Sequence, residues 1–275
     1  MGIRLNYEER RSKVGEMNSE KNSMEVQVAI VTGAARGIGR EIANRFAKSG
    51  WLVHSFDVIA PNETTEKFDW LANIFDHKVN CADSQALNSA VQEVIDSHSR
   101  IDLLVNNAGI VFRSAFEAFP EDEWQRVIDI NITAVFLGMK IVGKKMLEAG
   151  KGSIVNITSI SAERGAPGRA AYVASKAAVI GLTRTAAVEW GGRGIRVNAV
   201  GPGYVETPML LDAISSGDLD PAKILQRIPQ GRFAKPEEIS AVVYFLASED
   251  ASYINGQTLF VDGAFLADYG VNLES

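Results

Sequence analysis

The sequence predicts an α/β protein in which one doubly wound, seven-stranded parallel sheet carries helices on both faces. From Val26 onward, short runs rich in β-branched residues alternate with helical patterns, which is typical of βαβ units. A glycine-rich turn separates the first strand from the first helix. No linker, low-complexity tract or repeat interrupts the alternation, so we expect a single domain over residues 26–275 with a Rossmann fold.

Each expected strand is a short apolar run, and each expected helix shows apolar positions at helical spacing. In chain order, strands are expected at Val26–Thr32, Trp51–Asp57, Ile101–Val105, Ser153–Thr158, Arg196–Val200 and Thr258–Val261, with a third strand ending before Asn80. Helices are expected at Arg40–Ser49, at Ser84–Ser97, within Glu121–Ala149, at Ala170–Trp190 and at Pro236–Ser248.

Composition and charge exclude several classes of protein. The chain carries 28 Lys and Arg against 34 Asp and Glu, and a net charge of −6 argues against a nucleic-acid partner, because such binding depends on a basic surface. The sequence contains no apolar run of about 18 residues, so it predicts no membrane span. Cys81 is the only cysteine, so it cannot form an intramolecular disulfide, and the chain fits a cytoplasmic location. Residues 1–25 mix charges of both signs with few apolar residues, which predicts a flexible N-terminal extension.

The turn after the first strand has the pattern of a phosphate-binding loop. It reads Thr32-Gly33-Ala34-Ala35-Arg36-Gly37-Ile38-Gly39, and a helical pattern follows at once. Glycines let the backbone approach a pyrophosphate closely, and a helix N-terminus offers unpaired N–H groups and the positive end of a dipole. The alternative is a glycine-rich turn that binds nothing.

Two side chains near this loop predict opposite cofactor preferences. Asp57 ends the second strand, where a carboxylate accepts hydrogen bonds from the adenosine ribose and repels a 2′-phosphate. Arg36, inside the loop, would pair with that phosphate. We favour Asp57 because its repulsion acts directly on the group that distinguishes the two cofactors, so NAD is expected and NADP is less favoured.

A tyrosine, a lysine and a serine form the candidate catalytic group. Tyr172 and Lys176 are four residues apart in the expected helix Ala170–Trp190, so both side chains lie on one face. A nearby lysine cation favours the phenolate, which would let Tyr172 act as general acid or base. Ser159 follows the strand Ser153–Thr158 at its carboxyl end, where α/β sheets bind ligands, and would hold a substrate oxygen. A surface tyrosine–lysine pair and a serine that caps the strand end are the structural alternatives.

Together these residues resemble the short-chain dehydrogenase/reductase family, over nearly all of the chain from Val26 to Gly263. The motifs occur in the family's order and in the expected strand and helix context. They are Thr32-Gly33-x-x-x-Gly37-x-Gly39, Asn106-Asn107-Ala108-Gly109, the tetrad Asn131, Ser159, Tyr172 and Lys176, and Gly201-Pro202-Gly203 followed by Thr207. One stretch departs from the pattern: Asn80-Cys81-Ala82-Asp83 stands where many relatives carry Asp-x-x-Asp, so we expect a weaker contact with adenine.

The resemblance implies hydride transfer between a nicotinamide cofactor and a secondary alcohol or its ketone, in a dinucleotide-binding catalytic domain that requires no metal. Tyr172 would exchange the hydroxyl proton and Ser159 would hold the substrate oxygen. Lys176 would bind the nicotinamide ribose and lower the tyrosine pKa, and Asn131 would anchor a water in the proton relay. The residues expected to bind the cofactor are Gly33, Arg36, Gly37, Ile38, Gly39, Asp57, Asn107, Ala108, Gly109, Tyr172, Lys176, Pro202, Gly203, Val205 and Thr207.

The resemblance also implies a homotetramer. We expect it to be built on the helices of Glu121–Ala149 and Ala170–Trp190 and on the C-terminal segment. Four large apolar residues of that segment would pack against a neighbouring subunit: Phe265, Leu266, Tyr269 and Leu273.

The leading functional hypothesis is an NAD-dependent oxidoreductase whose substrate is a small polyol, sugar or other hydroxylated metabolite. The alternatives are an NADPH-dependent 3-oxoacyl-(acyl-carrier-protein) reductase and, from another class, a non-catalytic nicotinamide-sensing regulator. Three arginines lie in segments that line the substrate pocket in this family and would recognise a carboxylate, a phosphate or hydroxyls, although solvated loop arginines are commoner: Arg113, Arg164 and Arg169. The three histidines are expected at the surface or at strand ends, without a catalytic role: His54, His77 and His98.

Overall fold

The computed structural model describes residues 26–59 and 69–268, and it confirms the predicted α/β class. Its sheet has seven strands in the order β3-β2-β1-β4-β5-β6-β7, and every pairing is parallel. The strands are β1 (Val28–Thr32), β2 (Leu52–Asp57), β3 (Ile74–Lys78), β4 (Leu103–Asn106), β5 (Gly152–Ile157), β6 (Ile195–Pro202) and β7 (Thr258–Val261). The predicted N-terminal extension, residues 1–25, lies outside the described residues.

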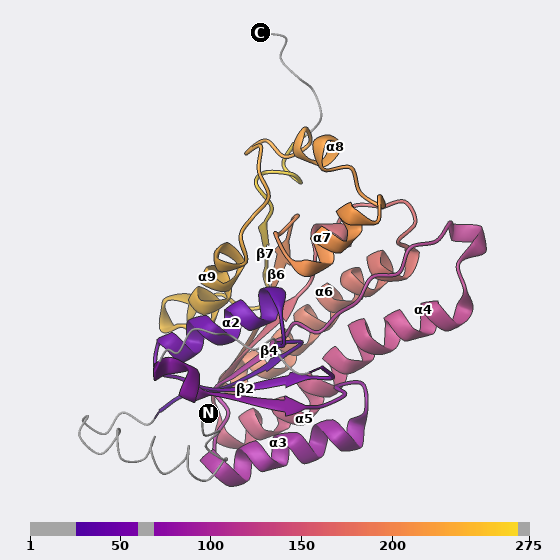
Figure 1. Cartoon of the computed structure of the whole chain (residues 1–275). Coiled ribbons are helices and arrows are strands. Elements are labelled where there is room, and N and C mark those ends of the chain that lie inside the picture. The colour runs from indigo at the N-terminus through magenta and orange to yellow at the C-terminus, as the bar shows by residue number, and fades with distance from the viewer. Residues whose placement is uncertain (1–25, 60–68, 269–275) are drawn as a thin grey trace, which may run out of the picture.

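Helices cover both faces of the sheet (Figure 1). The α-helices are α2 (Gly37–Lys48), α3 (Ser84–His98), α4 (Glu121–Ile128), α5 (Ala134–Ala149), α6 (Ala170–Trp190), α7 (Pro208–Ser215), α8 (Pro221–Leu225) and α9 (Pro236–Ala247). One core cluster joins alternate strand residues to α2 and α9, and the other joins the opposite strand faces to α3, α5 and α6. Because both faces are covered, every residue of β1 is buried, as expected for a parallel sheet.

The strand order determines where a ligand can bind. Beyond β1 the chain winds outward through β2 and β3, and then it returns to the other side of β1 to form β4. The connections that follow β1 and β4 therefore leave the sheet in opposite directions, which opens a crevice at the carboxyl ends of these two strands. Open α/β sheets bind their ligands in such a crevice.

Three regular elements were not assigned by residue range from the sequence. Strand β3 lies at the sheet edge, so only Ile74 and Phe75 of its five residues are buried and its sequence lacks a continuous apolar run. Helices α7 and α8 lie between β6 and α9. Each begins with a capping side chain, Thr207 or Asp220, followed by proline, which is a recognisable helix start.

The C-terminal segment packs in part against its own chain. Phe265 is buried in a cluster with Ile160, Ile224 and Ile228, and Leu266 packs against this cluster but stays partly exposed. The expected packing of this segment against a neighbouring subunit stays a prediction. The other two apolar residues of that expectation lie outside the described residues: Tyr269 and Leu273.

The expected position of His54 was also wrong. This side chain lies in the middle of β2, is only 1% exposed and stacks on Phe75. Its two ring nitrogens meet those of the other histidines, with Nδ1 2.9 Å from His77 Nε2 and Nε2 3.0 Å from His98 Nε2. Burial lowers the pKa of His54 well below its ordinary value, and His77 and His98 lower it further. The histidine cluster therefore holds His54 in its neutral form.

Burial also lowers the pKa of His77, against the opposing effect of Glu93 and Asp76. The described residues contain no group of three His, Cys, Asp or Glu side chains arranged to hold a metal ion. No helix among residues 26–59 and 69–268 is long and apolar enough to cross a membrane.

The histidine cluster predicts a loss of stability in mild acid. A histidine whose pKa is lower in the folded than in the unfolded chain stabilises the fold fully above the unfolded pKa, roughly 6.5, and this contribution is lost as the pH falls below it. The free energy of unfolding should therefore fall between pH 7 and pH 5, by up to about 1.4 kcal/mol per pH unit for each proton gained. Urea denaturation at several pH values measures the slope.

The variant His54→Gln should flatten this slope even if it lowers stability overall, because the chain has only three histidines and all three lie in the cluster. An equal slope in the wild type and the variant would contradict the assignment.

Candidate active site

A cavity of about 430 Å³ opens at the carboxyl ends of the central strands, where the strand order reverses. It is lined by the glycine-rich loop after β1, by the ends of β2, β4, β5 and β6, and by the start of α6 and α7. All but two of the residues expected from the sequence to be catalytic or to bind the cofactor line this cavity. The two exceptions are Gly39 and Asn131, which are buried behind its wall.

The glycine-rich loop has the features that a pyrophosphate needs. Helix α2 begins at Gly37 without a side-chain cap at Arg36 and without an acidic residue in its first turn, so its N-terminal dipole remains available to an anion. Helices α3, α7 and α8, in contrast, are each capped by a side chain. Gly33 has φ +65°, and a Cβ there would lie 2.7 Å from Ala108 Cα. A larger residue at Gly33 would therefore displace the loop and close the cradle.

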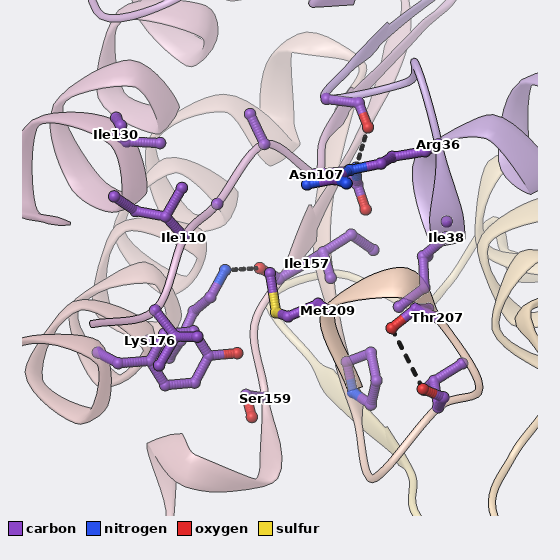
Figure 2. A pocket seen from close by; sticks show the side chains of 18 of the residues that line it. Arg36, Ile38, Asn107, Ile110, Ile130, Ile157, Ser159, Lys176, Thr207 and Met209 are labelled. Carbon is purple, nitrogen blue, oxygen red and sulfur yellow. Dashed lines mark hydrogen bonds between the residues drawn. The ribbon is translucent and has the colours of Figure 1, made fainter. Parts of the chain in front are cut away.

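Asn107 fixes this loop to the neighbouring strand. Its side-chain Nδ2 donates to the carbonyl oxygens of Thr32 at 3.0 Å and Gly33 at 2.9 Å. The Thr32 hydroxyl in turn accepts from the backbone amides of Asn107 at 3.0 Å and Ala108 at 3.1 Å. Figure 2 shows Asn107 and one dashed hydrogen bond beside it. These four bonds hold the ends of β1 and β4 in register at the crevice.

Asp57 lies where a ribose would be recognised. Its Oδ2 accepts from the Ala35 amide at 3.0 Å and its Oδ1 from the Ile59 amide at 3.2 Å, so backbone groups orient the carboxylate beside the glycine-rich loop. The two residues that follow it, Val58 and Ile59, also line the cavity and bring no positive charge to this end. Arg36 is exposed and lines the same cavity (Figure 2).

Asn80 and Cys81 line the cavity close to this region. The Asn80 Oδ1 accepts from the Ala82 amide at 3.1 Å. Burial raises the pKa of the Cys81 thiol to about 12, with a further contribution from Asp57, so this thiol stays protonated. Cys81 is 7% exposed and acts as a small buried residue.

Tyr172 and Ser159 meet across the cavity from the first turn of α6 and the end of β5. Ser159 is buried, and its hydroxyl accepts from the Ser161 amide at 3.1 Å. Burial raises the pKa of Tyr172, while a hydrogen bond with Ser159 and the charges of Arg169 and Arg113 lower it. The net shift is upward, whereas the sequence led us to expect a lysine-driven decrease. The two arginines are the main positive charges acting on the phenol.

Lys176 lies one helical turn beyond the tyrosine and is 4% exposed. Its Nζ donates to the Ile157 carbonyl at 2.9 Å and lies 5.8 Å from the centre of the Tyr172 ring (Figure 2). The Thr158 hydroxyl donates to the Lys176 carbonyl at 2.7 Å, which fixes α6 against the end of β5. Burial lowers the pKa of Lys176 to about 8. The lysine is therefore a buried cation held at the floor of the site.

Asn131 lies in a π-helical segment, Asp129–Thr133, between α4 and α5. Such segments are rare and occur often at functional sites. Its Oδ1 accepts from the Ile110 amide at 2.9 Å, and its Nδ2 donates to the Ile110 carbonyl at 2.9 Å and to Ser175 Oγ at 3.0 Å. Both N–H donors of the side chain are thus used inside the protein, while Oδ1 can accept one further hydrogen bond. Its amide joins the loop after β4 to α6.

Sequence reasoning missed most of the apolar lining of the cavity. These residues are Phe56, Val58, Ile59, Val79, Ile110, Val111, Ile130, Ala134 and Ile157. Most of them lie at or shortly after the end of a strand, which was the available signal, because the carboxyl ends of parallel strands share one edge. Ile130 and Ala134 come instead from the π-helical segment and α5, where no such signal exists. Arg164, in contrast, was a candidate pocket residue but does not line the cavity.

Comparisons with known proteins agree with this geometry. The family model described as Enoyl-(Acyl carrier protein) reductase matches residues 33–265. The chain is 40% identical to the 3-oxoacyl-[acyl-carrier-protein] reductase FabG of Thermotoga maritima over 246 residues, which cover 88% of this chain and 99% of that protein. It is 37% identical to the 2-dehydro-3-deoxy-D-gluconate 5-dehydrogenase of Bacillus subtilis over 251 residues, which cover 89% of this chain and 96% of that protein.

A solved structure from Agrobacterium tumefaciens shares the fold. It is described as a candidate 2-deoxy-D-gluconate 3-dehydrogenase with bound NADP, and it matches with a TM-score of 0.81 and 37% identity, covering 90% of this chain and 100% of that one. The match supports a nicotinamide dinucleotide as the cofactor of this chain. By sequence and by structure, the chain belongs to the short-chain dehydrogenase/reductase family.

Proposed function

We propose that the protein is an NAD-dependent oxidoreductase that interconverts a secondary alcohol and its ketone in a small polyol, sugar or other hydroxylated metabolite. The observation that carries the proposal is the single cavity in which the phosphate cradle of α2 and the group formed by Ser159, Tyr172 and Lys176 face one another. The bound nicotinamide would supply or accept the hydride. The catalytic domain extends from residue 26 in this proposal, and a cytoplasmic location is consistent with the single, buried Cys81.

The residues of the site divide the chemistry among themselves. The Ser159 hydroxyl holds the substrate oxygen, and the Tyr172 hydroxyl gives it a proton during reduction and takes one during oxidation. Lys176 positions the nicotinamide ribose from the floor of the site, where the Ile157 carbonyl fixes its Nζ. Asn131 keeps the loop after β4 in place through its side chain and would anchor a water of the proton relay. Most of the protein's contribution is orientation within a largely buried site.

Two features support NAD over NADP. The Asp57 carboxylate is oriented by two backbone amides beside the loop, and the residues after it are apolar. A 2′-phosphate placed there would meet a negative charge without a compensating cation on β2. Arg36 is the feature that favours NADP, and it also supports the second candidate function, an NADPH-dependent 3-oxoacyl-(acyl-carrier-protein) reductase, the activity named for the Thermotoga maritima relative.

Removal of the tyrosine hydroxyl tests the catalytic assignment. The variant Tyr172→Phe should lower kcat/KM for the best alcohol or ketone found in a substrate screen by about 10²–10⁴-fold, because general acid–base catalysis is lost while the ring remains. Its affinity for NADH, measured by nicotinamide fluorescence, should stay within threefold of the wild type. The matched control is Tyr244→Phe, since Tyr244 packs against Phe46 away from the cavity. Full activity of Tyr172→Phe would instead favour a non-catalytic, nicotinamide-sensing role.

Parallel titrations with NADH and NADPH test the cofactor assignment. We expect NADH to bind at least tenfold tighter, which corresponds to about 1.4 kcal/mol. Asp57→Asn should reduce this ratio toward one, because it removes the charge and keeps an acceptor oxygen for the Ala35 amide. Arg36→Gln should leave the preference for NADH in place. If the wild type prefers NADPH and Arg36→Gln abolishes that preference, the reductase becomes the better account.

We also propose that the protein is a homotetramer built on α5 and α6. Large apolar side chains remain exposed on these helices, with Phe136 on α5 47% exposed and Val188 on α6 85% exposed. A groove of about 570 Å³ runs between the two helices and is lined by Phe136, Leu147, Leu182 and Trp190 among others. Exposed apolar surface of this kind is typical of a subunit interface.

The variant Phe136→Glu tests the interface. Size-exclusion chromatography with light scattering should give the mass of four chains for the wild type at micromolar concentration and a smaller assembly for the variant, because a charged carboxylate would replace an apolar ring in the proposed interface. Lys78→Glu, at an exposed position of the edge strand β3 outside the groove, is the control for added negative charge. A monomeric wild type would exclude the tetramer.

A further inference from the structure

Two arginines line the substrate end of the cavity. Arg113 and Arg169 share this wall with Ser159 and Tyr172, and the charges of both arginines act on the phenol. They come from two loops that a backbone hydrogen bond joins, in which the Ser114 amide donates to the Gly168 carbonyl at 3.0 Å. Arg113 precedes Ser114 and Arg169 follows Gly168, so the backbone itself brings the two guanidinium groups to one place.

The protein neutralises this pair only in part. Arg113 Nη1 lies 3.5 Å from Asp218 Oδ2, a contact at the long end of hydrogen bonding, and the Asp218 side chain is 46% exposed. Within the described part of the chain, Arg113 Nε is buried and has no hydrogen-bond partner. Burial and the charge of Arg169 both lower the pKa of Arg113. A partly desolvated donor beside a like charge is costly unless a ligand satisfies it.

The third candidate arginine behaves differently. Arg164 is exposed and lies outside the cavity, where its Nη2 donates to the carbonyls of Leu266 at 3.0 Å and Asp268 at 3.3 Å. It serves the C-terminal segment, so it provides a matched control for the loss of a nearby positive charge.

We propose that the substrate carries an oxyanion, a carboxylate or a phosphate, which Arg113 and Arg169 bind while its secondary alcohol or ketone lies between Ser159 and Tyr172. This inference rests on the proposed oxidoreductase function and names the class of its substrate. A guanidinium offers paired N–H donors that match two oxygens of a carboxylate or phosphate. The Nε of Arg113 supplies a donor that no protein group takes. A hydroxy acid, a sugar acid or a polyol phosphate would satisfy the site.

Binding measurements on the full-length protein saturated with NAD⁺ test the proposal independently of turnover. Calorimetry compares three pairs of ketones that differ in charge: 4-oxopentanoate with 4-oxopentanamide, 3-oxobutanoate with 3-oxobutanamide, and dihydroxyacetone phosphate with dihydroxyacetone. At least one anionic member should bind tenfold or more tightly than its neutral partner. The pair that shows this distinguishes a carboxylate from a phosphate.

The variants assign the effect to residues. Arg169→Gln and Arg113→Gln should each bring the best ratio to threefold or less, and Arg164→Gln should leave it unchanged. The control for correct folding is that each variant retains the wild-type affinity for NAD⁺ and the wild-type thermal midpoint. If Arg113→Gln fails this check, Arg169→Gln alone decides.

Three results would overturn the inference: no anionic probe binds at millimolar concentration, the neutral partners bind equally well, or the preference survives in Arg169→Gln. Failure of the proposed function is a separate result, in which NAD⁺ does not bind or no alcohol or ketone is turned over. An anion preference that depends on Arg169, found without any turnover, would leave the binding site standing and reject the oxidoreductase.

Discussion

The site depends on one contact between two strands, the hydrogen bonding of the Asn107 side chain to the carbonyls of Thr32 and Gly33. β1 and β4 are neighbours in the sheet, but the segments that follow them leave in opposite directions. Without a tie at this point, nothing in the sheet ladder would fix the glycine-rich loop relative to the loop after β4. The four hydrogen bonds among Thr32, Gly33, Asn107 and Ala108 give the crevice between these two loops a defined shape.

A second set of buried polar contacts carries the same register to the catalytic helix. Asn106 Nδ2 donates to Asn156 Oδ1 at 2.8 Å, and Asn156 Nδ2 donates to Thr183 Oγ1 at 2.9 Å, so β4, β5 and α6 are linked in turn. All three side chains are buried, and a half-satisfied network there would be costly. Because the same helix presents Tyr172 and Lys176, the distance between the phosphate cradle and the proton donor is set by hydrogen bonds in the core. These hydrogen bonds therefore fix the catalytic group relative to the cofactor site.

The sequence predicted what local patterns determine. The alternation of strands and helices, the glycine-rich loop, and Tyr172 with Lys176 all follow from spacing along the chain, and the structure brings them to one cavity. The prediction was incomplete or wrong where tertiary contact decides. β3 was expected before Asn80 without a residue range, because it is an edge strand with polar residues. His54 was expected outside the core, but it lies inside, where two other histidines satisfy its ring nitrogens. The closeness of Arg113 and Arg169 depends on a bond between loops far apart in sequence.

The histidine cluster has a consequence for how the enzyme's response to acidity must be interpreted. β2 carries His54 within its buried part and Asp57 at its cavity end, and His77 packs edge-on against Phe56, which lines the cavity. No histidine lies among the described residues that line the cavity. A decline in rate below neutral pH would therefore report the loss of the packing that holds β2 in place. A change in rate at alkaline pH would instead report the deprotonation of the buried Lys176 and Tyr172. The two limbs of one rate profile would measure different properties, one of folding and one of chemistry.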